Sequence, residues 1–355
     1  MQTAQVMLFN GPDRQLEAKN FDIPSLKEGE ILVENLYTTI CGSDIHTFTG
    51  MRQELCPTVL GHEIVGKIIA INVQHSGTDL RGKTLAPGDR VTWTVFSSDP
   101  SSVNALAGMP QKGKGLFKYG HALATNTDAL NGGLSQLCIL KQHTGILKID
   151  ELIPLSVAAT LNCSVATAAG ALRLAGHVKG KRVLITGMGH LGITCASMCK
   201  TAGAKWVAAA DVSADRLAQS AKFGVDEQFN LNNGNETIMM SELFDIVIDM
   251  SGSPAAMEIG VDKLSIGGLA IWVGAVFNTR KVAINPEAII RSLISIKGLH
   301  NYNLSDFCYA VEFMEQNWKT FPFEKIVDQE FELKKSDEAF RYAIAHKPLR
   351  VGIKI

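Results

Sequence analysis

The stretch RVLITGMGHLG, residues 182–192, decides the fold of this chain. Its first five residues, 182–186, form a run that is apolar on both faces, as expected of a central strand in a parallel sheet. The glycines that follow have the spacing G-x-G-x-x-G and open a helix predicted over residues 190–202. The alternative is a glycine turn that binds no cofactor. A strand before the turn and a helix after it favour a dinucleotide site.

Each residue of the turn has an expected role in that site. Gly187 permits the tight turn, Gly189 lets the backbone approach a pyrophosphate, and Gly192 lets the helix pack closely on the strand. His190 and Leu191 begin the helix, whose N-terminus faces the phosphate charge, and belong to the same cofactor site.

A carboxylate ends the next predicted strand. Asp211 closes the run 205–211, where it would accept hydrogen bonds from the adenosine ribose hydroxyls. The same negative charge repels a 2′-phosphate, so NAD(H) is preferred over NADP(H). Arg216 either flanks the adenosine or is an ordinary exposed helix residue.

The rest of the sequence predicts two domains. Strands and helices alternate over residues 155–298, which indicates an α/β domain with a doubly wound parallel sheet. Residues 1–154 contain short strands bounded by Gly, Pro and Asp, typical of a compact β-barrel or sandwich. Residues 299–355 return to helices with a final strand at 349–353 and are expected to rejoin the first domain.

The individual elements follow from the same patterns. Strands are expected at residues 31–36, 64–71, 90–95, 182–186, 205–211, 245–250, 269–274 and 295–298, and helices at 155–176, 190–202 and 214–223.

Composition excludes several classes of function. With 355 residues, 46% hydrophobic content and a net charge of -1, the chain has no electrostatic reason to bind nucleic acid or an anionic membrane. The N-terminus lacks the pattern of a secretory signal, and the apolar stretch 155–174 contains polar residues that suit a buried helix. Seven scattered cysteines fit reduced thiols in the cytoplasm better than a disulfide framework.

Two short segments near the N-terminus carry metal-binding side chains. They read ICGSDIH, residues 40–46, and GHEIVG, residues 61–66. A thiolate and an imidazole suit zinc better than calcium or magnesium. A site needs at least one more ligand, and the number of protein ligands separates a catalytic zinc from a structural one.

With these segments ahead of the glycine motif, the chain resembles the zinc-dependent medium-chain alcohol and polyol dehydrogenases. That resemblance covers essentially the whole chain and implies a GroES-like catalytic domain followed by a Rossmann domain. It also implies a third zinc ligand shortly before the Rossmann domain, a position that Cys163 fills. Cys41, His62 and Cys163 would then hold one zinc with an open fourth position, the catalytic arrangement.

The resemblance implies roles for further residues. Asp44 would orient His62, Glu63 would ligate zinc transiently, and Ser43 and His46 would relay a proton to solvent.

Three further positions match the part of the family that lines the cofactor. Gly274, Gly298 and Arg350 fall where the family surrounds the nicotinamide and pyrophosphate.

One departure from the family is clear. Many relatives bind a second, structural zinc through four closely spaced cysteines, and no cysteine lies between Cys56 and Cys138. We therefore expect one zinc per subunit. The stretches 109–121 and 132–135 are similar to dehydrogenase-like proteins of phosphonate catabolism.

That narrower similarity suggests a role for three cations. Arg52, Lys118 or His121 would meet an anionic phosphonate, or else they are ordinary solvated loop charges.

The expected activity is reversible hydride transfer between an alcohol, such as a hydroxyalkylphosphonate or polyol, and NAD. Two alternatives remain open: a zinc-free enone or quinone reductase of the same fold, and a non-catalytic NAD-binding protein. The family resemblance further implies a cytoplasmic homodimer or homotetramer acting on a small molecule.

Overall fold

The chain divides into two compact units. A computed structural model describes residues 2–232 and 242–355. The first unit comprises Met1–Cys163, Asn303–Lys319 and Phe323–Ile355, and the second comprises Ser164–Tyr302 and Thr320–Pro322. The chain passes from the first unit to the second after residue 163 and returns after residue 302. The sequence predicted these boundaries earlier, at 154/155 and 298/299.

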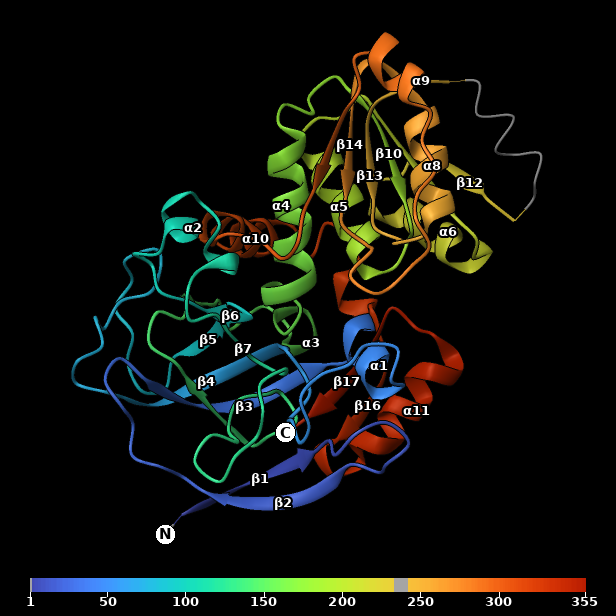
Figure 1. Cartoon of the computed structure of the whole chain (residues 1–355). Coiled ribbons are helices and arrows are strands. Elements are labelled where there is room, and N and C mark those ends of the chain that lie inside the picture. The colour runs from blue at the N-terminus through green and yellow to red at the C-terminus, as the bar shows by residue number, and fades with distance from the viewer. Residues whose placement is uncertain (1, 233–241) are drawn as a thin grey trace. The chain divides into compact units, whose positions relative to one another are not determined.

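The second unit is built on a six-stranded parallel sheet with the order β12-β11-β10-β13-β14-β15 (Figure 1). Its strands are β10 (Arg182–Thr186), β11 (Trp206–Asp211), β12 (Glu227–Asn230), β13 (Phe244–Asp249), β14 (Leu264–Trp272) and β15 (Ser295–Gly298). The predicted doubly wound sheet is confirmed. Only β12 was not expected, because a short edge strand of sequence EQFN has no run of buried apolar residues.

The strand order reverses between β10 and β13. After β10 the chain adds β11 and β12 on one side, and it then returns to place β13 and β14 on the other. In doubly wound sheets, ligands bind at the carboxyl ends of the strands at this switch point. The glycine turn 187–189 follows β10 there, so the fold places it at the expected ligand-binding edge.

Helices α4, α5, α6 and α8 pack against this sheet. They span Ala166–Ala175, His190–Thr201, Ala214–Ser220 and Pro254–Asp262, and the short helices η3 (Ala221–Phe223) and α9 (Pro286–Arg291) belong to the same unit. Their strand partners Val183, Leu184 and Ile185 have no exposed surface. The predicted alternation of strand and helix is therefore confirmed.

A seven-stranded, mostly antiparallel sheet organises the first unit. The order is β16-β17-β3-β4-β5-β9, with β8 also paired to β3. These strands are β3 (Ile31–Thr39), β4 (Glu63–Ile71), β5 (Arg90–Trp93), β8 (Leu137–Leu140), β9 (Ile146–Lys148), β16 (Val327–Glu332) and β17 (Arg350–Lys354). Pairing of β17 with β3 confirms that the C-terminal tail rejoins the first unit.

Alternate residues of β3 serve two separate apolar cores. Ile31 and Val33 belong to one buried cluster, while Leu32 between them belongs to another. This is the two-residue period of a strand that is covered on both faces.

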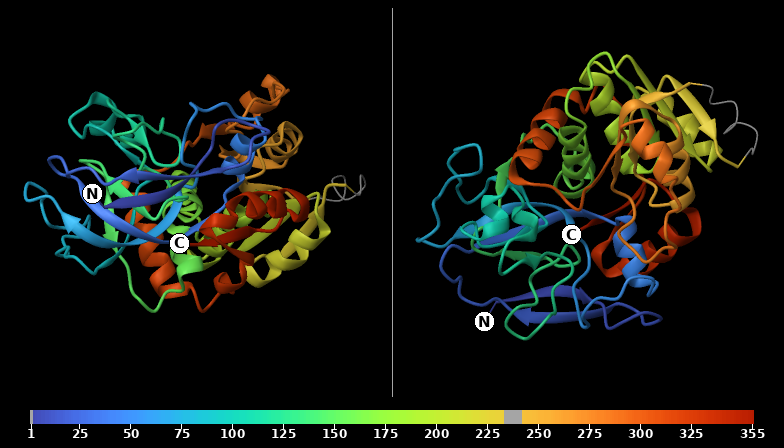
Figure 2. Two further views of the ribbon diagram at one scale, coloured as in Figure 1. Left: turned by 90° about the horizontal axis from the view of Figure 1, so that it is seen from below. Right: turned by 45° about the horizontal axis from the view of Figure 1, so that its top comes forward.

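The other described elements of the first unit are paired strands and helices; the N-terminal strands are blue and the C-terminal helices red in Figure 2. They are β1 (Thr3–Leu8), β2 (Glu17–Asp22), β6 (Phe96–Ser97), β7 (Phe117–Lys118), α1 (Gly42–Phe48), α2 (Val103–Leu106), η1 (Pro110–Lys112), α3 (Leu155–Ala158), α10 (Leu304–Asn317), η4 (Phe323–Lys325), η5 (Leu333–Lys335) and α11 (Ser336–His346).

The helix predicted over 155–176 is interrupted. After α3, residues Leu161–Val165 form a π-helical turn, and α4 follows. By length and hydropathy the stretch Leu155–Ala175 resembles a membrane span, but 83% of its most apolar window is buried inside the protein. A wide turn of this kind is frequent at functional sites, and this one contains Cys163.

Candidate active site

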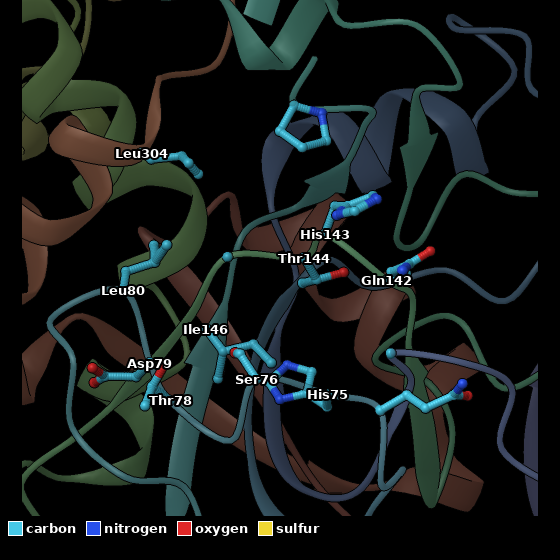
Figure 3. Close-up of a pocket in the computed structure, with 14 residues that line it drawn as sticks. His75, Ser76, Thr78, Asp79, Leu80, Gln142, His143, Thr144, Ile146 and Leu304 are labelled. Carbon is cyan, nitrogen blue, oxygen red and sulfur yellow. The ribbon is translucent and has the colours of Figure 1, made fainter. Parts of the chain in front are cut away.

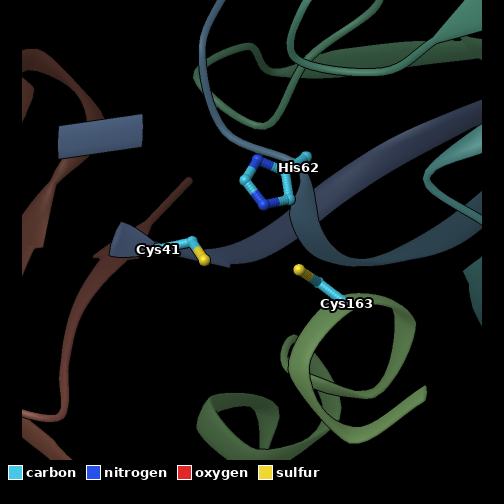
Figure 4. A group of neighbouring side chains, drawn as sticks. All are labelled: Cys41, His62 and Cys163. Carbon is cyan, nitrogen blue, oxygen red and sulfur yellow. The ribbon is translucent and has the colours of Figure 1, made fainter. Parts of the chain in front are cut away.

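Three metal-binding side chains meet in the first unit (Figure 4). Cys41 caps the N-terminus of α1, His62 lies directly before β4, and Cys163 lies in the π-helical turn. Their ligand atoms all lie within 4.8 Å of one another. Two thiols and one imidazole suit zinc, and three protein ligands leave a fourth position for water or substrate. We call these residues the Cys–His–Cys trio.

The imidazole of the trio is oriented by a buried carboxylate. Asp44 Oδ1 lies 3.1 Å from His62 Nδ1, and Asp44 has no exposed surface. The other carboxylate oxygen accepts from the Cys41 N–H at 2.9 Å, so one side chain holds two members of the trio. His62 Nε2 is consequently the ring nitrogen available to a metal, and it lies 3.3 Å from Ser43 Oγ.

Hydrogen bonds and charges set the protonation of the trio. A hydrogen bond from the Cys163 thiol, together with the charges of Arg350 and His62, lowers the pKa of Cys41 well below its ordinary value. The same hydrogen bond, with burial, raises the pKa of Cys163. Burial lowers the pKa of His62, but Asp44 and Cys41 outweigh it and raise that pKa well above its ordinary value. A thiolate is thus favoured at Cys41, the form that binds metal.

A buried ion pair lies beside Cys41. Arg350 donates from Nε to Glu63 Oε2 at 2.6 Å and from Nη2 to Glu63 Oε1 at 2.7 Å. Glu63 has no exposed surface, Arg350 is 8% exposed, and Thr39 Oγ1 also donates to Glu63 at 2.6 Å. The guanidinium further contacts Cys41 Sγ at 3.7 Å. Arg350, expected at the cofactor, therefore has its charge directed at Glu63 and Cys41.

Replacement of Arg350 by methionine is expected to destabilise the protein by about 3–5 kcal/mol, because it leaves the Glu63 carboxylate buried without a partner. The measurement is the free energy of unfolding in urea. The double variant Arg350→Met/Glu63→Gln should recover part of the loss. Arg280→Met is the matched control, since Arg280 makes the same two-point contact with Glu258 on an exposed surface and should lose far less. Equal losses for the two arginines would contradict this account.

The basic side chains that could meet an anionic substrate lie around one carboxylate, although burial lowers the pKa of His121. Glu54 Oε1 is 2.6 Å from Arg52 Nη2 and 3.3 Å from His121 Nδ1. The His121 ring lies 5.1 Å from the His62 ring, centroid to centroid. Burial, with the charge of Arg52, lowers the pKa of Lys118, and the charge of Glu54 partly opposes this shift. We call Arg52, Lys118 and His121 the basic cluster.

His46, expected in a proton relay, lies in the same helix as Ser43. Burial lowers the pKa of its half-buried imidazole. Its backbone carbonyl accepts a hydrogen bond from the N–H of Arg52 at 3.0 Å, which ties the end of α1 to the basic cluster.

The glycine turn of the second unit has the shape that a pyrophosphate requires. Gly187 has a φ of 90°, and a Cβ there would meet the Ser251 nitrogen at 2.6 Å. A Cβ at Gly192 would overlap the carbonyl oxygen of Gly187, so helix and turn touch backbone to backbone. A Cβ at Gly189 would meet nothing within 4 Å and would project into open space at the helix N-terminus. That open cradle fits a dinucleotide phosphate.

Apart from Arg350, which belongs to the first unit, the other predicted cofactor residues lie around this turn or within its unit. Asp211 Oδ2 accepts from the Met188 N–H at 2.5 Å and Oδ1 from the Ser213 N–H at 2.8 Å. The carboxylate at the end of β11 therefore also holds the glycine turn, through the N–H of Met188. His190 is 1% exposed, and its Nδ1 lies 2.7 Å from Ser164 Oγ.

Three more of the predicted residues belong to the same unit. Leu191 is partly exposed at the start of α5, Arg216 lies in the first turn of α6, and Gly274 follows β14. Gly298, the last residue of β15, is exposed.

Sequence reasoning missed two residues that stabilise the site, one through the trio and one through Glu63. Asn162 Nδ2 donates to the backbone carbonyl of His62 at 3.0 Å, and Thr39 supports Glu63. Asn162 precedes Cys163 in sequence, but an amide beside a cysteine carries no signal of its own. Its role depends on a contact across 100 positions of the chain.

A pocket of about 350 Å³ lies elsewhere in the first unit (Figure 3). His75, Asp79, Gln142 and His143 are among its lining residues, and no predicted site residue lines it. The Asp79 carboxylate accepts from the N–H groups of Arg81, Lys83 and Lys148, so it stabilises the surrounding loops.

Comparison with known proteins gives the class. Residues 27–151 match the alcohol dehydrogenase GroES-like domain, and residues 191–316 match the zinc-binding dehydrogenase domain. The chain belongs to the zinc-dependent medium-chain dehydrogenase family and is an oxidoreductase of that family.

Individual relatives agree with this class. An L-threonine 3-dehydrogenase of Aeromonas hydrophila is 28% identical over 306 residues, which are 83% of each chain. An alcohol dehydrogenase structure from Thermotoga maritima matches with a TM-score of 0.89 and 25% identity over 100% of both chains. A protein of Sinorhizobium meliloti solved with bound NADP matches with a TM-score of 0.87 over 100% of both chains, and at 18% identity it supports the fold alone.

Proposed function

We propose that this protein is a zinc-dependent, NAD(H)-linked dehydrogenase that interconverts an alcohol and an aldehyde or ketone. The observation that carries the proposal is the Cys–His–Cys trio, whose three ligand atoms lie within 4.8 Å and whose donor set suits a catalytic zinc. Cys41, His62 and Cys163 would hold one zinc per subunit. When bound, zinc acts as a Lewis acid that lowers the pKa of a hydroxyl group towards neutrality.

The residues around the trio orient it and move the proton. Asp44 accepts from His62 Nδ1 and so directs Nε2 into the site. Ser43 Oγ, 3.3 Å from His62 Nε2, is suited to accept the proton that leaves the substrate hydroxyl. His46 would pass that proton to solvent, and burial favours its neutral, proton-accepting form. Glu63, held by Arg350, is the remaining carboxylate of the site.

The second unit would bind the cofactor, which accepts or donates the hydride. Backbone N–H groups of Gly189, His190, Leu191 and Gly192 would receive the pyrophosphate, while Gly187 makes the turn and donates its own N–H to the Ala210 carbonyl. Gly274 and Arg350 are proposed at the nicotinamide and pyrophosphate.

Cofactor preference would be decided by one carboxylate. Asp211 at the end of β11 favours NAD(H) by repelling a 2′-phosphate, with Arg216 beside the adenosine.

Two other functions compete with this proposal. A zinc-free reductase would not need the trio, and a non-catalytic NAD-binding protein would not need Ser43 and His46 beside it. The deciding experiment measures zinc content and NADH formation with a panel of alcohols. About one zinc per chain with turnover supports the proposal, and no zinc with no turnover on any alcohol rejects it.

The substrate is proposed to be a hydroxyalkylphosphonate or a polyol, and the basic cluster favours the anion. Arg52→Ala or Lys118→Ala is expected to raise the KM for a hydroxyalkylphosphonate about tenfold or more, because each removes a charge-assisted contact, while the KM for a neutral polyol stays unchanged. Lys83→Ala, at an exposed lysine of the same unit, is the control. Unchanged KM values for the anion in both variants would reject the anionic substrate.

The protein is also proposed to be a cytoplasmic homodimer or homotetramer. The strand β15 forms the edge of the six-stranded sheet, and Ile266, Ile290 and Leu293 are at least 70% exposed in the same unit. Light scattering of the purified chain measures the oligomeric state.

A further inference from the structure

A buried carboxylate at the end of β13 contacts the last residue of β10, next to the glycine turn, and the turn that follows β13. Asp249 is 1% exposed. Its Oδ1 accepts from Thr186 Oγ1 at 2.8 Å, from Ser251 Oγ at 2.6 Å and from the Ser251 N–H at 3.2 Å. Its Oδ2 accepts from the Gly252 N–H at 3.0 Å. Several donors of this kind offset the cost of burying a charged group.

The backbone of the same residue reaches the next strand. The carbonyl oxygen of Asp249 accepts from the N–H of Val273 at 3.0 Å and of Gly274 at 3.2 Å. Asp249 therefore connects the end of β10, the turn after β13 and the end of β14, which are the strands on either side of the switch point.

The turn that Asp249 holds, Ser251–Gly252, packs in close backbone contact between Gly187 and Gly274. A Cβ at Gly187 would meet the Ser251 nitrogen at 2.6 Å, and a Cβ at Gly252 would meet the Gly274 carbonyl oxygen at 2.5 Å. The Ser251–Gly252 backbone thus separates Gly187 of the pyrophosphate turn from Gly274 by direct contact on both sides. Both N–H groups of this spacer are bound by the Asp249 carboxylate.

We propose that Asp249 is a positioning residue for the cofactor: by holding Ser251 and Gly252, it sets the spacing between the pyrophosphate turn at Gly187 and the segment at Gly274. The inference rests on the proposed binding of NAD(H) by this unit. Asp249 acts through the backbone of its neighbours and makes no contact with the cofactor itself. A dinucleotide that spans the two segments binds well only when their spacing is correct.

The chain contains a matched control at the other end of the same strand. Asp245 Oδ2 accepts from the Arg182 N–H at 2.8 Å, so it also connects β13 to β10, but at the amino ends of the strands. Loss of Asp245 should affect folding stability without reaching the ligand-binding edge.

The test compares Asp249→Asn and Asp245→Asn by the Kd for NADH, from its fluorescence, and by Tm. An asparagine at position 249 would place its own N–H groups against donors that the carboxylate now accepts from. Ser251 and Gly252 would then be held less well, so the Kd for NADH should rise about tenfold or more. Asp245→Asn should leave that Kd unchanged and lower Tm less, because its carboxylate is partly exposed and accepts one hydrogen bond from the described residues where that of Asp249 accepts four. Zinc content should stay the same in both, since the trio belongs to the first unit.

Several outcomes would overturn the inference. An unchanged Kd in Asp249→Asn, or an equal rise in both variants, would reduce Asp249 to a stabilising residue. If Asp249→Asn does not fold, Ser251→Ala removes one contact to the same carboxylate, and an unchanged Kd in that variant rejects the inference. Failure of the unaltered protein to bind NADH would instead reject the proposed cofactor.

Discussion

Replacing any member of the Cys–His–Cys trio is expected to abolish both zinc binding and activity. Cys163→Ser, Cys41→Ser and His62→Ala each leave two ligands, which do not hold zinc in a catalytic site. Because zinc supplies several kcal/mol of stabilisation to the reacting oxygen, kcat/KM should fall by a factor of ~10³ or more. Zinc per chain, measured by elemental analysis, should fall from about one to near zero.

Two further variants sharpen this prediction. Asp44→Asn keeps the ligands but alters the orientation of His62, so zinc affinity should fall by about 10–100-fold without complete loss. Cys56→Ser replaces an exposed cysteine outside the trio and should change neither zinc content nor rate. A trio variant that retains zinc and full activity would show that the metal site lies elsewhere.

A matched pair of glycine substitutions is expected to separate folding from cofactor binding. At Gly192 an alanine Cβ would overlap the Gly187 carbonyl oxygen, so Gly192→Ala should cost about 1–3 kcal/mol of stability as helix α5 moves away from the turn. At Gly189 the Cβ meets no atom within 4 Å, so the folded protein accepts it. The methyl group would occupy the space meant for the pyrophosphate. Gly189→Ala should therefore raise the Kd for NADH about tenfold or more.

The measurements are urea unfolding and NADH fluorescence on both variants. The expected pattern is a Kd effect without a stability effect at Gly189, and a clear stability loss at Gly192. Gly180→Ala is a poor control, because Gly180 has a φ of 74° that strains any alanine. Gly42→Ala is the control for the stability measurement, because Gly42 has a negative φ and open space for a Cβ. NADH affinity unchanged in Gly189→Ala would mean that the cofactor does not approach this turn.

The sequence predicted the elements with the strongest local signals. It missed two polar edge strands and also short apolar strands such as β8 (LCIL) and β9 (ILK). The run 182–186 became β10 with its expected bounds, because consecutive apolar residues suit a strand that is covered on both faces. The strands β12 and β16 were missed, since EQFN and VDQEFE are polar and lie at sheet edges. The single helix expected over 155–176 has a π-helical turn at Leu161–Val165, which hydropathy does not encode.

In the candidate site, too, the sequence predicted the residues of local motifs and missed a contact between distant residues. Cys41, Asp44 and His62 lie in two short motifs, and the structure brings them together with Cys163. The partner of Glu63 was not predictable. Arg350 lies 287 positions away, and no local pattern in the sequence links its guanidinium to the Glu63 carboxylate that it binds.

By itself the sequence determined the parts whose signal is local: the class of fold, the glycine turn and the metal-binding side chains. Hydrophobic period, turn residues and motif spacing act over a few residues, so they can be read without coordinates. Only the tertiary structure decided which distant groups meet, such as Arg350 with Glu63 and Asp249 with Thr186. These contacts arise because folding brings separate strand ends together and buries their charges, and a buried charge requires a partner wherever the chain supplies one.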